Sequence, residues 1–184
     1  MANFKAKPIS KQEIRELAKA IRKKCGLEDI HRIPVCIFFE WIMEKLFPNF
    51  EWEIVADYTM SEEGVTFSGA NKIIIRQDVY VAACHGDGRA RFTIMHEIGH
   101  FLLHGPNRVA LCRLGSGEKL KSFEDPEWQA DTFAAEFLMD FDLIQGMNYK
   151  QISDECGVTY GAAKTRIGKI QGGGLCKSSY LYPK

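Results

Sequence analysis

The fold is decided by one stretch, Thr93-Ile94-Met95-His96-Glu97-Ile98-Gly99-His100-Phe101-Leu102-Leu103-His104. Its apolar residues recur at helical spacing, which predicts a buried amphipathic helix. His96 and His100, four residues apart, then lie on one face of the helix, about 6 Å apart along its axis. Two imidazoles at that separation can bind one zinc ion. The alternative is a core helix whose histidines only form hydrogen bonds.

Glu97 occupies a particular place beside this pair of histidines. It lies about 100° around the helix from His96 and about 60° from His100. It therefore borders the metal face without pointing at the metal. A general base for an attacking water would stand at that place.

Two histidines leave a zinc ion short of a protein ligand. The pattern with a third histidine six residues after His100 is absent, because position 106 is Pro106. His104 lies about 12 Å along the helix from His96, too far for three tetrahedral ligands to converge. Another element must supply the third ligand.

The stretch from 125 to 139 offers that ligand. Asp125 and Pro126 predict the start of a helix, as N-cap and first helical residue. Glu127 and Asp131 then lie on one face, so that Glu127 can bind the metal while Asp131 accepts the free ring N–H of a ligand histidine. Glu136 points to the opposite side of the same helix.

The two motifs together resemble the ImmA/IrrE family of zinc metallopeptidases. The resemblance rests on residues 96–104 and 127–139 and covers roughly residues 30–170. It implies a gluzincin-like, zincin-like fold, a Zn²⁺ cofactor, frequent encoding by mobile elements, and a phage-type transcriptional repressor as the protein substrate. The chain departs from the family pattern at 129–131, where Gln-Ala-Asp replaces Glu-Ala-Asn.

The predicted fold class is α+β, with a small mixed sheet packed on the metal helix. We assign 1–148 to a zincin-like metallopeptidase domain, 149–171 to a helical corner packed on the same domain, and 172–184 to a flexible tail. Strands are expected at 50–56, 64–68 and 72–76. By resemblance, 72–76 is the edge strand that pairs with an extended peptide substrate; the alternative is an internal strand with no free edge.

Composition and charge restrict the class of protein, its cellular compartment and its partners. With 46% hydrophobic and 26% charged residues, the chain is an ordinary globular one, without a run that could span a membrane and without a signal peptide. Its six scattered cysteines indicate reduced thiols in a cytoplasmic protein. The net charge is zero, but 26–155 carries a net charge of −11 between two basic ends. That acidic body favours basic partners over a polyanion.

The last third suggests a competing function. Residues 149–167 have the outline of a helix-turn-helix, and Lys164, Arg166 and Lys169 could touch phosphates. We favour packing or partner binding over DNA binding, because Asp154 and Glu155 are acidic and the pI is about 6.9. The competing hypothesis is a non-catalytic, zinc-stabilised regulator that binds DNA or a repressor through this corner.

The residue that would stabilise the oxyanion is left open among three candidates. A hydrolytic zinc site gains from a second donor that stabilises the oxyanion of the tetrahedral intermediate. His104, one turn beyond His100, is one candidate, and Tyr149 and Tyr160 from the C-terminal corner are the others.

Overall fold

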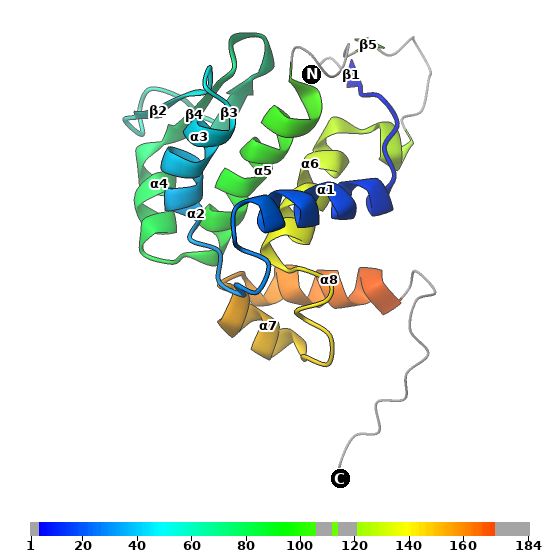
Figure 1. Cartoon of the computed structure of the whole chain (residues 1–184). Helices are drawn as coiled ribbons and strands as arrows, with labels where there is room; N and C mark the ends of the chain where they lie inside the picture. Colours follow the sequence, from blue (N-terminus) through cyan, green and yellow to red (C-terminus); the bar gives the residue numbers. More distant parts are fainter. Residues whose placement is uncertain (1–3, 106–111, 114–120, 172–184) are drawn as a thin grey trace.

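The computed structural model of the chain describes residues 4–105, 112–113 and 121–171 (Figure 1). The helical elements are α1 (Lys11–Lys24), α2 (Val35–Ile37), the π-helical η1 (Phe38–Ile42), α3 (Met43–Leu46), the 3-10 turn η2 (Ser68–Ala70), α4 (Gln77–Cys84), α5 (Gly88–His104), the 3-10 turn η3 (Ser122–Glu124), α6 (Pro126–Leu138), α7 (Tyr149–Cys156) and α8 (Tyr160–Gln171). The strands are β1 (Phe4–Lys5), β2 (Glu51–Val55), β3 (Gly64–Phe67), β4 (Lys72–Arg76) and β5 (Cys112–Arg113). The predicted α+β class with a small mixed sheet is confirmed.

The main sheet has the strand order β2-β4-β3. β4 pairs with β2 in parallel and with β3 antiparallel, so it lies in the centre. Its Ile73 and Ile75 are fully buried, as suits β-branched residues in a central strand. The expectation that 72–76 is a substrate-binding edge strand is therefore wrong, because β2 occupies the side of β4 that was expected to be free. β3 is the edge strand that lies against α5.

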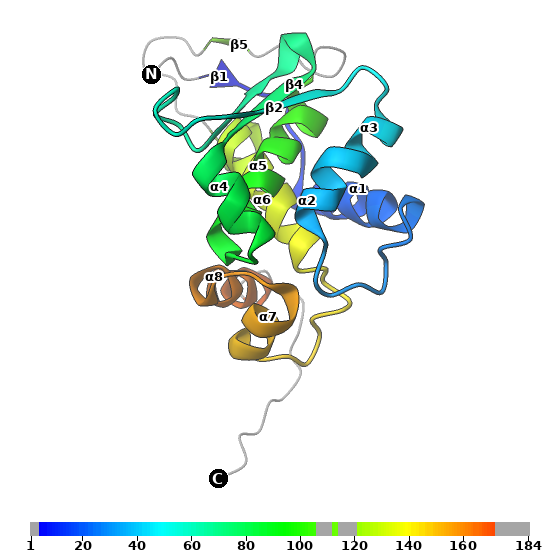
Figure 2. The ribbon, with the colours of Figure 1, turned by 90° about the vertical axis from the view of Figure 1, so that its left-hand side faces the viewer.

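Helices α5 and α6 pack closely side by side and form the centre of the molecule (Figures 1 and 2). A Cβ at Gly99 would stand 3.1 Å from both the Cα and the carbonyl oxygen of Ala130, so the glycine permits this close approach. Farther along α6, the rings of Phe133 and Phe137 stack on each other, with centroids 5.5 Å apart. The helix that carries the two histidines is thus held at short range against the helix that carries Glu127.

The helix ends follow from local sequence in several places. Ser10 and Glu13 form the capping box of α1, and the side chain of Asp125 accepts from the amide of Glu127 at 3.0 Å. Asp87 caps α5 by accepting from the amide of Ala90. The metal helix therefore begins at Gly88.

Helices α7 and α8 form a corner below the rest of the molecule (Figure 2). Gly157 adopts φ +63° at the end of α7. A Cβ at Gly88 would stand 2.6 Å from the carbonyl carbon of Val158, so the corner abuts the beginning of α5. The buried Arg91 ties the two together by donating to the carbonyl oxygen of Gly157 at 2.8 Å. The predicted tail at 172–184 lies outside the described residues.

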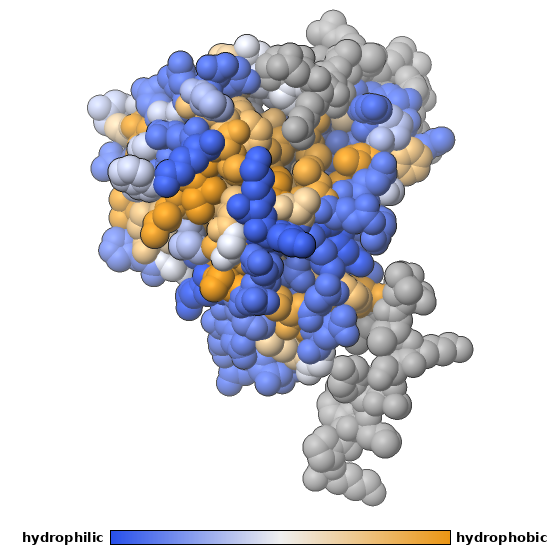
Figure 3. Space-filling model, viewed as in Figure 1, coloured by the Kyte–Doolittle hydropathy of each residue, from blue (hydrophilic) through white to orange (hydrophobic). Residues whose placement is uncertain are grey.

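The surface is polar at its rim, and hydrophobic residues gather in the middle of the face drawn in Figure 3. None of the helices in the described ranges combines the length and the hydrophobicity that a membrane crossing demands.

Candidate metal centre

Three side chains from two helices converge on one point. The Nε2 atoms of His96 and His100 are 3.0 Å apart, and the Oε2 atom of Glu127 lies 3.3 Å from the first and 3.5 Å from the second. A tetrahedral zinc ion with bonds of about 2.0–2.1 Å separates its ligand atoms by about 3.4 Å. The triangle therefore has the size that three ligands of one such ion require, and the set of donors suits a divalent metal.

The centre is open to solvent on one side. The side chain of Glu127 is 71% exposed, whereas those of His96 and His100 are 18% and 16% exposed. This asymmetry leaves the three ligand atoms accessible to solvent from the side of Glu127, whereas a closed structural site would bury them.

Each histidine has a partner for its other ring nitrogen. The Nδ1 atom of His96 donates to the Oδ1 atom of Asp131 at 2.8 Å, as the spacing of Glu127 and Asp131 predicts. The Nδ1 atom of His100 lies 3.0 Å from the Nδ1 atom of His104. Because the outer nitrogens are engaged, both rings are oriented with Nε2 toward Glu127.

The electrostatics of the cluster favour a positive charge at its centre. Burial disfavours the charged ring of His96, but its hydrogen bonds with Asp131 and Glu127 outweigh this and raise the pKa of His96 to about 9. The neighbouring rings of His100 and His96 hold the pKa of the Glu127 carboxyl well below its usual range. A bound cation would supply this positive charge without a proton.

Glu97 is buried between α5 and the edge strand β3. Its Oε2 atom accepts from the hydroxyl of Thr66 at 2.6 Å, and its residue is 8% exposed. A Cβ at Gly64 would stand 2.8 Å from the Cγ of Glu97, so only glycine lets the strand come this close without a shift. The sheet thus fixes the orientation of Glu97 next to the histidines.

The remaining predicted residues lie in different surroundings. His104 is buried and its two ring nitrogens face His100 and Gln129, and burial lowers the pKa of its ring to about 4. Tyr149 and Tyr160 pack against each other in the α7–α8 corner, with ring centroids 4.9 Å apart. Figures 1 and 2 show this corner where α5 begins, whereas the histidines run from the middle of that helix to its last residue.

One predicted contact of the corner is wrong. Arg166 is 3% exposed and pairs with the buried carboxylate of Glu136, so it is not available to a phosphate. Lys164 and Lys169 are exposed.

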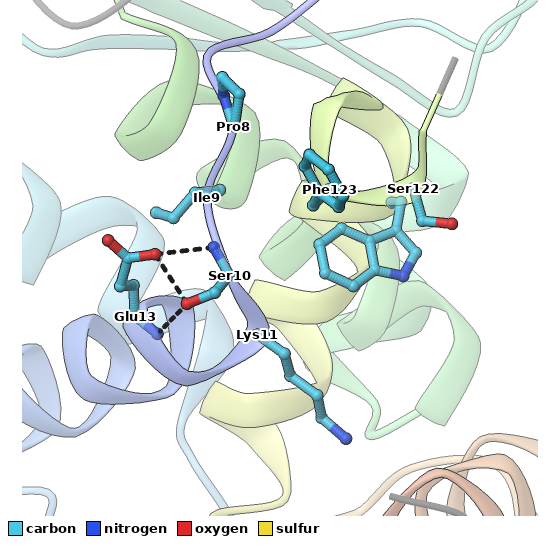
Figure 4. Close-up of a pocket in the computed structure, with 8 residues that line it drawn as sticks. Pro8, Ile9, Ser10, Lys11, Glu13, Ser122 and Phe123 are labelled. Carbon is cyan, nitrogen blue, oxygen red and sulfur yellow. Dashed lines mark hydrogen bonds between the residues drawn. The ribbon is translucent and has the colours of Figure 1, made fainter. Parts of the chain in front are cut away.

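A pocket of about 460 Å³ lies elsewhere, between the segment before α1 and the start of α6 (Figure 4). Two of its polar residues bond to each other: the amide and the hydroxyl of Ser10 both donate to Glu13, at 2.8 and 2.7 Å. Phe123 and Trp128 supply much of its wall. The pocket does not include the three converging side chains, and we assign no chemistry to it.

Two residues of the site were missed by sequence reasoning. Thr66 contacts Glu97 from a strand 31 positions earlier, and nothing in its local sequence marks it. Gln129 contacts His104; its signal was the departure from the family pattern at that position.

Comparisons with known proteins place the chain in a family. The model of Peptidase_M78, described as the IrrE N-terminal-like domain, matches residues 50–167. Among solved structures, a Mycobacterium tuberculosis transcriptional regulator is similar, with a TM-score of 0.52, 11% sequence identity, and coverage of 86% of this chain and 48% of that one. The chain thus spans about half the length of that regulator, and the likeness shows the fold alone. No protein with a curated description gives a significant match.

Proposed function

The chain belongs to the peptidase family of the IrrE N-terminal-like domain, and from this premise we propose that it is a zinc-dependent endopeptidase that cleaves a partner protein. The observation that carries the proposal is the convergence of His96, His100 and Glu127 at the spacing of three zinc ligands. Zinc is preferred on ligand type, although the same donors suit manganese or iron. When bound, the ion polarises the substrate carbonyl and acidifies water.

The protein residues around the ion have separate roles. Glu97 accepts the proton of the attacking water and passes it to the leaving nitrogen. Thr66 keeps the Glu97 carboxylate in place through its 2.6 Å hydrogen bond. Asp131 holds the ring of His96 in the tautomer with a free Nε2.

The substrate is proposed to bind as an extended peptide along β3. Among the described residues β3 pairs only with β4, so its outer edge is free of strand pairing. Main-chain hydrogen bonds at such an edge give affinity without demanding a particular sequence. Family resemblance makes a transcriptional repressor of the phage type the expected substrate.

The competing function, a zinc-stabilised regulator that binds DNA or a repressor through α7 and α8, has weaker support. The buried pairing of Arg166 with Glu136 leaves Lys164 and Lys169 as the exposed basic residues of the recognition helix. Likeness to a transcriptional regulator is a likeness of fold at 11% identity.

Glu97→Gln separates the two functions. We expect this variant to keep its zinc and to lose cleavage of a candidate repressor by about 100-fold or more, because general acid–base catalysis contributes about 10²–10⁴. Metal analysis and a gel-based cleavage assay against candidate transcriptional repressors would measure both properties.

A variant that cleaves as fast as the wild-type protein would contradict the peptidase proposal. The regulator alternative would gain if DNA binding were present and fell on substitution of Lys164 and Lys169, with a reduced salt dependence.

A further inference from the structure

A chain of polar contacts runs from the protein interior to the ring of His100. The side-chain amide of Gln129 donates to the carbonyl oxygens of Lys7 and Phe123, at 2.9 and 2.8 Å. Its Oε1 atom lies 2.9 Å from the Nε2 atom of His104. The Nδ1 atom of His104 in turn lies 3.0 Å from the Nδ1 atom of His100.

The hydrogen bond between Gln129 and His104 can have only one direction. Both N–H groups of the Gln129 amide are used by backbone carbonyl oxygens, which can only accept. The atom that faces His104 is therefore the amide oxygen, which is also only an acceptor. It follows that the Nε2 atom of His104 carries a proton and donates it to Gln129.

The direction of the hydrogen bond between His104 and His100 follows from the burial of His104. If its Nδ1 atom also carried a proton, the ring would be a cation, at 3% exposure and with His100 and Gln129 as its hydrogen-bond partners among the described residues. A buried charge without a carboxylate partner is costly. The neutral ring presents a lone pair at Nδ1, so His100 must donate from its own Nδ1 atom. That assignment leaves the Nε2 atom of His100 unprotonated, facing His96 and Glu127.

We propose that Gln129 and His104 are positioning residues that fix His100 in the tautomer whose Nε2 atom is free to bind the metal. This inference rests on the proposed metal site and says how one of its ligands is prepared. The two ligand histidines are then oriented by different means. An exposed carboxylate, Asp131, holds His96, whereas a buried neutral pair holds His100 and adds no negative charge to the centre.

Zinc affinity of the full chain, measured by competition with a chromophoric chelator, tests the proposal. We expect His104→Leu to weaken zinc binding by about 10- to 100-fold, the usual cost of losing a partner behind a metal ligand. His104→Asn should recover most of that loss, because its side-chain oxygen can accept from His100 in place of Nδ1. His85→Leu is the matched control: this histidine is exposed, and its Nδ1 atom lies 2.8 Å from the carbonyl oxygen of Val81.

The order of the two His104 variants distinguishes positioning from packing. Leucine fills the volume of the buried site better than asparagine and brings no polar side-chain atoms of its own into the interior, so thermal unfolding should favour His104→Leu. Zinc affinity should favour His104→Asn. If affinity followed thermal stability instead, the effect would be structural and the proposal overturned.

Nitrogen-15 spectra of the zinc-loaded protein give an independent readout. We expect the ring of His104 to carry its proton on Nε2 and none on Nδ1, and Gln129→Leu to remove this preference. A proton on Nδ1 of His104 would overturn the assignment. Neither readout uses a substrate. If the zinc affinities of the variants follow the expected order but the wild-type protein cleaves nothing, the result would support this inference and refute the peptidase proposal. Equal affinities in variants that still cleave would overturn the inference alone.

Discussion

Helix α6 carries two glutamates, nine residues apart, that meet opposite kinds of neighbour. Glu127 faces the Nε2 atoms of two histidines, and its side chain is 71% exposed. Glu136 has no exposed side-chain surface and accepts from two guanidinium groups, those of Arg15 and Arg166. Its charge is therefore balanced by protein donors, whereas Glu127 and the two Nε2 atoms converge on a place that could hold a metal ion. The neighbours, not the residue type, separate a structural carboxylate from a candidate metal ligand.

The largest expected effect lies at Glu136. Glu136→Gln leaves Arg166, whose side chain is 2% exposed, without its counter-charge. Removing one partner of a buried ion pair typically costs about 3–5 kcal/mol of unfolding free energy. Urea denaturation of the metal-free chain would measure it. Glu127→Gln is the matched control, expected to cost less than about 1 kcal/mol because its side chain is exposed; equal losses would refute the contrast.

Zinc affinity should respond in the reverse order. Glu127→Gln removes one of three proposed ligands, so we expect zinc affinity to fall by more than about 100-fold. Losing a residue that only hydrogen-bonds to a ligand typically weakens metal binding by about 10- to 100-fold. Folded Glu136→Gln should bind zinc as the wild-type chain does. Competition titrations at matched folded concentrations would decide, and an unchanged affinity in Glu127→Gln would remove Glu127 from the ligand set.

A smaller effect is expected at Asp131. Asp131→Ala removes the acceptor that orients His96, and we expect about tenfold weaker zinc binding, at the low end because water can replace an exposed partner. Asp131→Asn keeps a side-chain oxygen acceptor and should bind nearly as well as the wild-type chain. The same titration tests both, and the role fails if the two variants are indistinguishable.

The smallest effect concerns the dependence of stability on pH. Burial alone would raise the pKa of the Glu136 carboxyl, but hydrogen bonds from Arg166 and Arg15 outweigh it and lower that pKa. A lowered pKa stabilises the fold above the unfolded value of about 4.3, and this contribution is lost as the pH falls through the folded pKa. Between pH 3 and 6, unfolding free energies of the wild-type chain should fall faster with acid than those of Glu136→Gln. Parallel curves would contradict this reading.

Much of the fold could be predicted because its signals are local. The capping pair of Ser10 and Glu13 and the Asp125-Pro126 helix start depend on neighbours a few residues away, and so does the i, i+4 spacing of the histidines. The helix α4 was missed because its apolar residues lack a clear helical stripe. The place of 72–76 in the sheet was wrong because pairing of β4 with β2 is set by tertiary contacts, which strand propensity does not encode.

The site residues, too, divide into those that local sequence predicts and those that only the packed structure shows. Spacing alone pointed to His96, Glu97 and His100, and a second helix start led to Glu127 and Asp131, which the fold brings beside His96. The contacts of Thr66 with Glu97 and of Arg166 with Glu136 join positions about 30 residues apart in sequence. Side chains that act across such separations carry no local pattern, so their partners emerge only from the packed structure.

The most direct test of the central claim is the position of the metal in crystals of the zinc-loaded protein, located by anomalous diffraction at the zinc edge. The account predicts one ion bound by Nε2 of His96, Nε2 of His100 and a carboxylate oxygen of Glu127, with bonds of about 2.0–2.2 Å. An ion bound elsewhere, or bound at the histidines with Glu127 turned away, would contradict it.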